Sequence, residues 1–259
     1  MIPRRTAEEC VQIDLQQFLA TQRGETPEKA KIVVPSIIFG FGHRARHGKD
    51  TAAKFIQEEC GKQYDIRLYS FARELKEEVN KNAIASGGMR NLFVEGLREP
   101  LGGYWQTNGN ILPLPEWVQY EENPDMTDPL CPFGKQRTLL QWWGTEYRRS
   151  IEPNYWVDRV AERLVKEKPE IALITDMRFP NEFLFVQKYG ETIKVHRPGI
   201  PVLPGAHASE EALASVPDHQ WSAVIYNDGT LEQLKQQAIY TFDELMEKVQ
   251  LEGENQGAL

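Results

Sequence analysis

The feature that most constrains this chain is a glycine-rich segment, residues 40–51, which reads Gly-Phe-Gly-His-Arg-Ala-Arg-His-Gly-Lys-Asp-Thr. An apolar, β-branched run precedes it and predicts a buried strand over residues 36–41. Residues 50–60 follow with apolar side chains at helical spacing, and a glycine at position 61 ends the helix. A glycine-rich loop between a strand and a helix presents backbone N–H groups to phosphate oxygens. The segment therefore predicts an α/β domain that binds a phosphate-bearing ligand.

The first interpretation of this segment is a P-loop, whose pattern is GxxxxGK followed by Ser or Thr. Gly48 and Lys49 supply the end of the pattern, and the lysine would reach the β- and γ-phosphates of a nucleotide. Two positions depart from it, because His43 stands at the first glycine and Asp50 at the Ser/Thr position. Thr51 follows directly, so a hydroxyl for Mg²⁺ is present one residue later.

The second interpretation is the dinucleotide fingerprint of a Rossmann fold, which Gly40, Gly42 and Ala45 fit at the spacing GxGxxA. That fold places Asp or Glu at the end of the second strand to bind a ribose, whereas the second strand expected here ends at residues 69–71 without a carboxylate. The fingerprint also leaves the later glycine–lysine pair unused. We therefore favour the P-loop, and keep a dinucleotide site and an ordinary glycine turn as alternatives.

The rest of the chain alternates between strand and helix patterns. We expect further strands over residues 66–71, 171–176, 191–196 and 223–226, and further helices over residues 72–85, 136–147, 155–166, 181–189, 209–215 and 230–251. Such alternation predicts an α/β fold of the P-loop kinase type, a three-layer sandwich with a mainly parallel central sheet and helical substrate-binding or lid insertions.

The same pass along the chain suggests its domain organisation. Residues 1–30 have a helical pattern and form an extension, and residues 31–250 form a single domain. Within that domain, residues 87–135 are rich in Gly, Pro, Asn and aromatic side chains, and we expect a long loop or inserted substructure there. Residues 136–168 form a helical segment, and residues 251–259 a flexible tail.

Charge and composition narrow the classes of partner. The net charge of -8 argues against binding a nucleic-acid backbone, whereas small anionic ligands need only a local cluster of Arg and Lys. The chain has no apolar run of about 18 residues and no hydrophobic signal core near its N-terminus, so we expect no membrane association and a cytoplasmic location. The three widely spaced cysteines predict reduced thiols. A homodimer is the one assembly that we retain as an expectation.

Asp176 ends a continuous apolar run, residues 171–175, that predicts a buried strand. Open α/β sheets bind ligands at the carboxyl ends of their strands, so Asp176 is placed to orient Mg²⁺ or its waters. Arg178 and Glu182 follow within about one turn and add a cation and a second carboxylate. In the alternative reading, Asp176 caps the following helix while Arg178 and Glu182 pair at the surface.

Phosphoryl transfer leaves little covalent work for side chains, so a kinase needs several cations to neutralise the moving phosphoryl group. Arg73 and Lys76 open the helix after the second strand, and Arg178 follows the strand that ends at Asp176, so these cations rank first. The other candidates, each of which is alternatively a solvated surface charge, are Arg46, Arg137, Arg148 and Arg149. A base could stack on Trp142, Trp143, Tyr147, Tyr155 or Trp156, of which Trp156 is preferred, or these aromatic residues fill a core.

These residues together resemble the bacteriophage deoxynucleoside monophosphate kinases, which are P-loop proteins of the nucleoside monophosphate kinase type. The resemblance begins with the Gly-Lys-Asp-Thr variant of the loop and continues, in order, to about residue 250. It rests on residues 46–51, 70–76, 140–149, 156–157, 175–182, 207–210 and 227–230. It implies transfer of the γ-phosphoryl group of ATP to a deoxynucleoside monophosphate, with Mg²⁺, to supply dNTP precursors for phage DNA synthesis. A phage-encoded enzyme of this kind would act in the host cytoplasm.

The resemblance also implies roles for particular residues. ATP would contact Arg46, His47, Gly48, Lys49, Asp50, Thr51, Asn227, Asp228 and Gly229, the last three near the adenine. The metal would be held by Thr51 and Asp176, and the catalytic residues would be Lys49, Arg73, Asp176 and Arg178. The acceptor would be framed by Arg73, Lys76, Arg137, Gln141, Gly144, Glu146, Arg148, Trp156 and Glu182. A segment containing His207 and Glu210 would close over the phosphates.

Two alternative functions stay open at this point. One is another P-loop small-molecule kinase, similar to dephospho-CoA kinase or phosphomevalonate kinase, which share parts of the loop and the Asn-Asp-Gly sequence at residues 227–229. The other, from a different class, is a nucleotide-binding switch or ATPase whose output is a conformational change. The base-recognition sequence Asn-Lys-x-Asp of GTPases is not found in the chain, which argues against that class.

Overall fold

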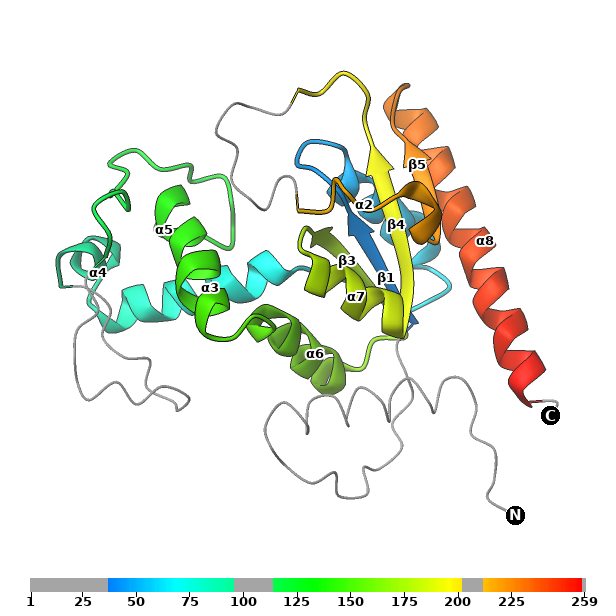
Figure 1. Cartoon of the computed structure of the whole chain (residues 1–259), viewed down its shortest axis with the longest axis horizontal. Coiled ribbons are helices and arrows are strands. Elements are labelled where there is room, and N and C mark those ends of the chain that lie inside the picture. The colour runs from blue at the N-terminus through cyan, green and yellow to red at the C-terminus, as the bar shows by residue number, and fades with distance from the viewer. Residues whose placement is uncertain (1–36, 96–113, 202–211, 258–259) are drawn as a thin grey trace, which may run out of the picture. The chain divides into compact units, whose positions relative to one another are not determined.

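The computed structural model of the chain describes residues 37–95, 114–201 and 212–257 (Figure 1). The chain divides into two compact units. We call residues 37–71 and 157–257 the sheet unit, and residues 72–156 the helical unit. The sheet unit contains β1 (Ile37–Gly42), α2 (Lys49–Cys60), β2 (Ile66–Tyr69), β3 (Ile171–Met177), α7 (Pro180–Tyr189), β4 (Gly190–His196), η3 (Asp218–Gln220), β5 (Ala223–Tyr226) and α8 (Leu231–Gly257).

The sheet has five strands in the order β2-β3-β1-β4-β5, and every neighbouring pair is parallel. Helices α2 and α8 lie against one face of the sheet, and α7 lies against the other face at β1 and β4 (Figure 1). A parallel sheet that is covered on both faces buries its strands completely, which is why β1 and β3 are almost continuously apolar. The expected α/β fold with a parallel central sheet is confirmed.

The core between the sheet and the α2–α8 layer is built from alternating strand residues and from one stripe of each helix. Phe39 in β1 contacts Phe242 in α8, with ring centroids 5.2 Å apart, and Ile56 of α2 is fully buried in the same cluster. On the opposite face α7 approaches β1 so closely that a Cβ on Gly40 would lie 2.7 Å from the side chain of Val186. Gly40 is therefore required for helix–sheet packing.

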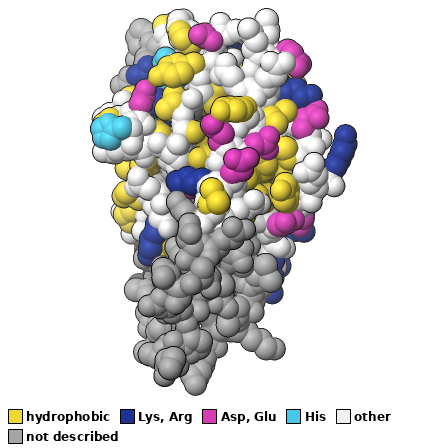
Figure 2. Space-filling model, turned by 90° about the vertical axis from the view of Figure 1, so that its right-hand side faces the viewer, with side chains coloured by type: hydrophobic (Ala, Val, Ile, Leu, Met, Phe, Trp, Pro, Cys, Tyr) yellow, Lys and Arg dark blue, Asp and Glu magenta, His cyan; other side chains and the backbone are white. Residues whose placement is uncertain are grey.

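The face of the sheet unit on which α8 lies carries Asp and Glu side chains among hydrophobic ones (Figure 2). The described Lys and Arg side chains on this face are scattered and do not gather into a band (Figure 2). The net charge of the whole chain is -8, and the expectation that the chain does not wrap a nucleic-acid backbone stays a prediction. Among the described residues, no helix combines the length and the apolar character that crossing a membrane requires.

The helical unit holds most of α3 (Phe71–Ala85), all of α4 (Met89–Glu95) and α5 (Arg137–Gln141), and a π-helix, η1 (Trp142–Arg149). Helix α6 (Tyr155–Glu167) begins in this unit and continues into the sheet unit. Residues 114–136 are irregular, and Gln136 anchors them, because its side chain accepts a hydrogen bond from the Glu121 N–H and donates one to the Glu121 carbonyl.

Several predicted elements differ from those observed. Helix α4 lies inside the segment expected to be a long loop or an inserted substructure. Residues 142–149 form a π-helix, where a regular helix was expected over residues 136–147. The second strand ends at Tyr69, and α8 continues to Gly257, into the expected tail. Residues 212–215, expected to be helical, form turns. The extension over residues 1–30, the residues 209–211 and part of the insertion lie outside the described residues, and the domain limits stay predictions.

Candidate functional site

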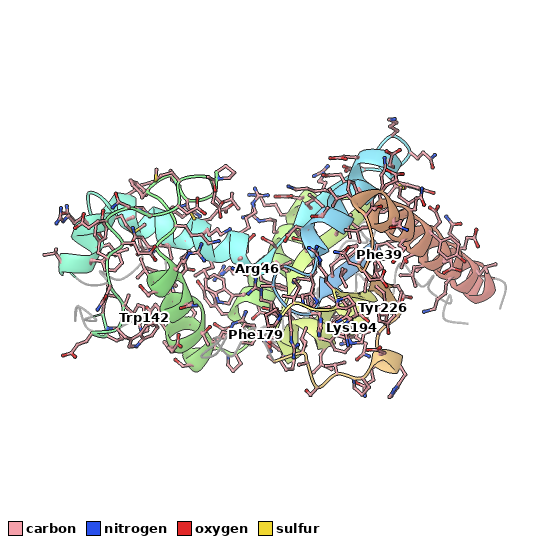
Figure 3. All side chains as sticks on the ribbon, turned by 90° about the horizontal axis from the view of Figure 1, so that it is seen from above. Phe39, Arg46, Trp142, Phe179, Lys194 and Tyr226 are labelled. Carbon is pink, nitrogen blue, oxygen red and sulfur yellow. The ribbon has the colours of Figure 1, made fainter. Side chains whose placement is uncertain are left out.

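The loop between β1 and α2 follows a backbone path that ordinary residues rarely adopt. His43 has a φ of 99°, Arg46 a φ of 62° and Gly48 a φ of 99°. A non-glycine residue with a positive φ costs on the order of 1–3 kcal/mol, and such residues cluster at functional sites. Arg46 is exposed and lies on this loop at the end of the sheet (Figure 3). The loop is thus held in a strained conformation at the carboxyl edge of the strands.

Lys49 is the first residue of α2, and its side chain bends back into the loop. It is only 4% exposed, and its Nζ donates a hydrogen bond to the Arg44 carbonyl. The first N–H groups of a helix have no partner within the helix and give its N-terminus a partial positive charge. The Lys49 ammonium is therefore hydrogen-bonded to a neutral carbonyl, and an anionic oxygen at the same place would be a stronger acceptor.

Asn227, directly after β5, ties the loop to the neighbouring strands. Its side-chain Nδ2 donates to the His47 carbonyl at 3.0 Å, and its backbone N–H donates to the His196 carbonyl at 2.7 Å. A Cβ on Gly48 would lie 2.6 Å from the same Nδ2. Gly48 is therefore fixed both by its positive φ and by this close contact. The predicted role of Asn227 near an adenine stays a prediction.

Asp176 lies next to the strand that carries the loop, because Gly42 of β1 pairs with Met177 of β3. Its Oδ1 accepts a hydrogen bond of 2.8 Å from the Phe71 backbone N–H at the start of α3. The carboxylate is half-buried at the carboxyl end of its strand, as predicted from the sequence. Thr51, one turn inside the neighbouring helix, is also partly exposed, so both residues offer oxygen atoms of the kind that Mg²⁺ prefers.

Glu182 has a structural task in α7. It is 1% exposed, and its Oε2 accepts hydrogen bonds from the backbone N–H groups of Arg178 at 2.7 Å and Phe179 at 3.0 Å. These contacts fix the turn between β3 and α7, where Figure 3 labels Phe179. The alternative that Asp176 caps this helix is wrong, because Phe179 is the residue before α7 and Glu182 supplies the cap. The predicted contact of Glu182 with the acceptor stays a prediction.

Three histidines, His43, His47 and His196, lie close together beside the loop. The sequence analysis gave a site role to His47 only, and it did not name His196. His43 and His47 belong to the loop, whereas His196 is the last residue of β4. Burial, followed by the charge of Lys194, lowers the pKa of His43 to about 3. Burial, followed by His196, lowers the pKa of His47 to about 4. The spacing of His43 and His47 hints at a pair, but nothing near either residue in the sequence points to His196.

The residues predicted to frame the acceptor lie mainly in the helical unit and differ in exposure. Arg137, Gln141 and Glu146 are exposed on the α5–η1 segment. Arg73 is half-exposed and pairs with Glu77 at 2.8 Å. Lys76 pairs with Asp128 at 2.8 Å, and both side chains are largely buried. In the sheet unit, Asp50, Asp228 and Gly229 are exposed, while His207 and Glu210 lie outside the described residues.

Arg148 and Trp156 belong to the interior of the helical unit. The Glu78 carboxylate accepts hydrogen bonds from Arg148 Nε at 2.6 Å, Trp143 Nε1 at 2.8 Å and the Tyr155 hydroxyl at 2.6 Å. Arg148 is 3% exposed, so its guanidinium is committed to this network. Trp156 is 1% exposed and donates from Nε1 to the carbonyl of Gly144 at 2.9 Å. Both side chains are buried, whereas a contact with the acceptor requires an exposed side chain. Their predicted roles stay predictions.

The sheet is parallel, and one of its edges carries both the glycine–lysine loop and the carboxylate of Asp176 at a strand end. This α/β fold is consistent with the P-loop kinase class. No family model matches the chain. The chain is similar to the deoxynucleoside-5'-monophosphate kinase of Escherichia phage T5, with 27% identity over 178 residues that cover 57% of this chain and 70% of the relative. The similarity supports a kinase-like protein.

Proposed function

We propose that the chain is an ATP- and Mg²⁺-dependent kinase that converts a deoxynucleoside monophosphate to the diphosphate. The observation that carries this proposal is the loop, which sets Lys49 and the N-terminus of α2 at the edge of the sheet, next to the strand that ends at Asp176. The phage T5 relative is a deoxynucleoside-5'-monophosphate kinase, which supports the choice of acceptor. Cytoplasmic location and the absence of a nucleic-acid or membrane partner belong to the same proposal.

The donor would bind through charge-assisted contacts. The β- and γ-phosphates of ATP would lie over the N-terminus of α2, and Lys49 Nζ would exchange the Arg44 carbonyl for phosphate oxygens. A hydrogen bond between charged groups contributes about 1.5–3 kcal/mol, compared with about 1 kcal/mol for a typical neutral one. Thr51 and Asp176 would hold Mg²⁺, which supplies charge neutralisation on the phosphates when it is bound.

The acceptor phosphate would be recognised by cations of the helical unit. Arg73 is the first candidate, because its exposed i,i+4 pair with Glu77 is worth only about 0.3–0.5 kcal/mol and is easily exchanged for a phosphate. Arg137 is the second, because it is exposed at the start of α5. Lys76 ranks below them, since leaving the largely buried Asp128 without its partner would be costly.

The test is a coupled ADP-release assay with ATP, Mg²⁺ and a panel of acceptors: dAMP, dGMP, dCMP, dTMP, dUMP and modified pyrimidine monophosphates. Lys49→Ala should lower turnover by about 10²–10³-fold, because it removes a charge aimed at the transferred phosphoryl group. Lys54→Ala, an exposed lysine of the same helix, is the matched control and should keep wild-type turnover. Melting temperatures of both variants separate loss of function from loss of folding.

Three outcomes would contradict the proposal. The first is that no acceptor is phosphorylated. The second is ADP release that does not depend on any acceptor, which would indicate an ATPase or a nucleotide-dependent switch. The third is an unchanged rate for Lys49→Ala, which would remove the loop from the phosphoryl-transfer step.

A further inference from the structure

Three imidazole rings meet where the loop passes the end of β4. The centroids of His43 and His47 are 4.9 Å apart, and each lies 5.5 Å from the centroid of His196. One ring nitrogen of each histidine lies within 4.8 Å of those of the other two. His43 and His47 are buried and His196 is half-buried.

The hydrogen bonding of His47 is incomplete. Its Nδ1 accepts the Arg197 backbone N–H at 3.0 Å and also lies 3.3 Å from His43 Nδ1. An imidazole nitrogen has a single lone pair, so it cannot accept both contacts fully. Its Nε2 is buried and has no hydrogen-bond partner among the described residues, although His47 is 1% exposed. Buried polar atoms are nearly always paired, so one polar partner is missing at this atom among the described residues.

The chemistry of the cluster favours a transition metal. Neutral imidazole suits Zn²⁺, Cu²⁺, Ni²⁺ and Co²⁺, whereas Mg²⁺ prefers oxygen ligands. The nearby Lys194, labelled with Tyr226 in Figure 3, opposes a second cation. Its Nζ is paired with Asp218 Oδ1 at 2.7 Å, and the Tyr226 hydroxyl donates to the other oxygen of Asp218.

The spacing of the rings is close to that of a metal centre. Zinc–nitrogen bonds of about 2.0–2.1 Å in a tetrahedral site place ligand nitrogens about 3.4 Å apart. One ring nitrogen of each histidine lies within 4.8 Å of those of the other two. No pair of these nitrogens would have to approach by more than about 1.4 Å to reach that spacing, and His196 is the least buried of the three residues.

We propose that His43, His47 and His196 bind one divalent transition-metal ion of the zinc class, with three imidazole ligands and a fourth position open to water or to an anion. This site goes beyond the proposed function, in which the metal ion of phosphoryl transfer has oxygen ligands from Thr51 and Asp176. A metal ion bound by the histidines would link the loop to β4. It would thereby restrain the segment on which the donor phosphates are proposed to lie.

Co²⁺ titration of the full chain, prepared without a histidine tag and in the absence of nucleotide, tests the site directly. Tetrahedral Co²⁺ gives strong visible absorption bands, and binding by thiolates of the cysteines would add charge-transfer bands in the near ultraviolet. Zn²⁺ should displace Co²⁺, and a large excess of Mg²⁺ should not. The variants are His196→Ala, at a half-buried position, and His43→Gly, because glycine favours the φ of 99° found there. His219→Ala, at an exposed histidine outside the cluster, is the matched control.

The expected result is saturation at one Co²⁺ per chain without thiolate bands. His196→Ala and His43→Gly should each weaken the affinity by more than about 10-fold, since even partners that only orient a ligand contribute that much. His219→Ala should bind as the wild type does. The proposal is overturned if Co²⁺ does not bind, if His196→Ala binds with unchanged affinity, or if thiolate bands appear. None of these results depends on kinase activity, so the proposed function stands or fails separately.

Discussion

Replacing Gly48 by alanine tests how the loop is held. The residue has a φ of 99°, and a new Cβ would lie 2.6 Å from Asn227 Nδ2. Real Cβ atoms do not approach another atom this closely, so the Asn227 side chain would have to move. Its hydrogen bond of 3.0 Å to the His47 carbonyl would be lost with that movement. The substitution therefore combines backbone strain with the loss of one contact between the loop and β5.

The two effects can be estimated separately. A non-glycine residue held in the left-handed region costs about 1–2 kcal/mol. The lost hydrogen bond costs about 0.5–1.5 kcal/mol. Together they should lower the free energy of unfolding by about 2–3 kcal/mol, which lowers Tm by about 5–10 °C for a chain of this size. ATP at 100 times its Kd should stabilise the wild type by about 2.7 kcal/mol, and Gly48→Ala should lose most of this stabilisation.

The assay is urea unfolding of each variant, with Tm measured in the presence and absence of ATP and Mg²⁺. Gly199→Ala is the matched control, because Gly199 has a φ of 76° and a Cβ there would meet no atom within 4 Å. It should show the backbone cost alone and keep the stabilisation by ATP. In an Asn227→Ala background the clash is removed, so Gly48→Ala should cost no more than Gly199→Ala. The reasoning is refuted if Gly48→Ala and Gly199→Ala are equally destabilising in the wild-type background, or if ATP still raises the Tm of Gly48→Ala fully.

Three further predictions concern buried polar groups. Glu182→Ala should cost about 1–3 kcal/mol in urea unfolding, because two backbone N–H groups lose their acceptor, and Glu182→Gln should cost less; equal losses would contradict the cap. Glu78→Ala should cost about 3–5 kcal/mol, because it leaves the buried guanidinium of Arg148 without its charged partner. Adding Arg148→Met should recover part of this loss. Purely additive effects in that double-mutant cycle would argue against the pair. With a chelator present to remove metal ions, the protein should lose stability as the pH falls from about 7 to about 5. The pKa values of His43 and His47 are about 3 and about 4, whereas unfolded histidines titrate near 6.5, so the unfolded chain binds more protons in this window. The loss should be about 1–2 kcal/mol per histidine at pH 5, and a variant with His43→Gly and His47→Asn should lack it; an unchanged pH dependence in that variant would show that other groups titrate.

The elements of the sheet unit were predictable because each carries its signal locally. Apolar runs gave β1 and β3, and Asp176 was placed correctly at a strand end because the run it follows is uninterrupted. The final helix was expected to start at Thr230, and it starts at the next residue. There the Thr230 hydroxyl accepts the Gln233 N–H, and Gln233 accepts the Thr230 N–H, which is a capping box.

The features that the sequence analysis missed depend on partners distant in the chain. Residues 142–149 have a helical pattern, and periodicity alone does not separate a π-helix from an α-helix. Nothing near Arg148 in the sequence indicates its hydrogen bond to Glu78, which lies 70 residues earlier. The histidine cluster needed the pairing of β1 with β4, which brings His196 beside the loop.

The same long-range contacts explain how a histidine can stand where a P-loop has its first glycine. A positive φ at His43 is unfavourable by itself, so the surrounding structure must impose it. Asn227 holds the His47 carbonyl, and the Arg197 backbone N–H holds the His47 ring, so β4 and β5 fix the second half of the loop from outside. The first half then has to bridge from β1 to a position that is already determined. The loop conformation is thus imposed by the C-terminal strands as much as by its own glycines, and this is why the motif could depart from its pattern and keep its place on the sheet.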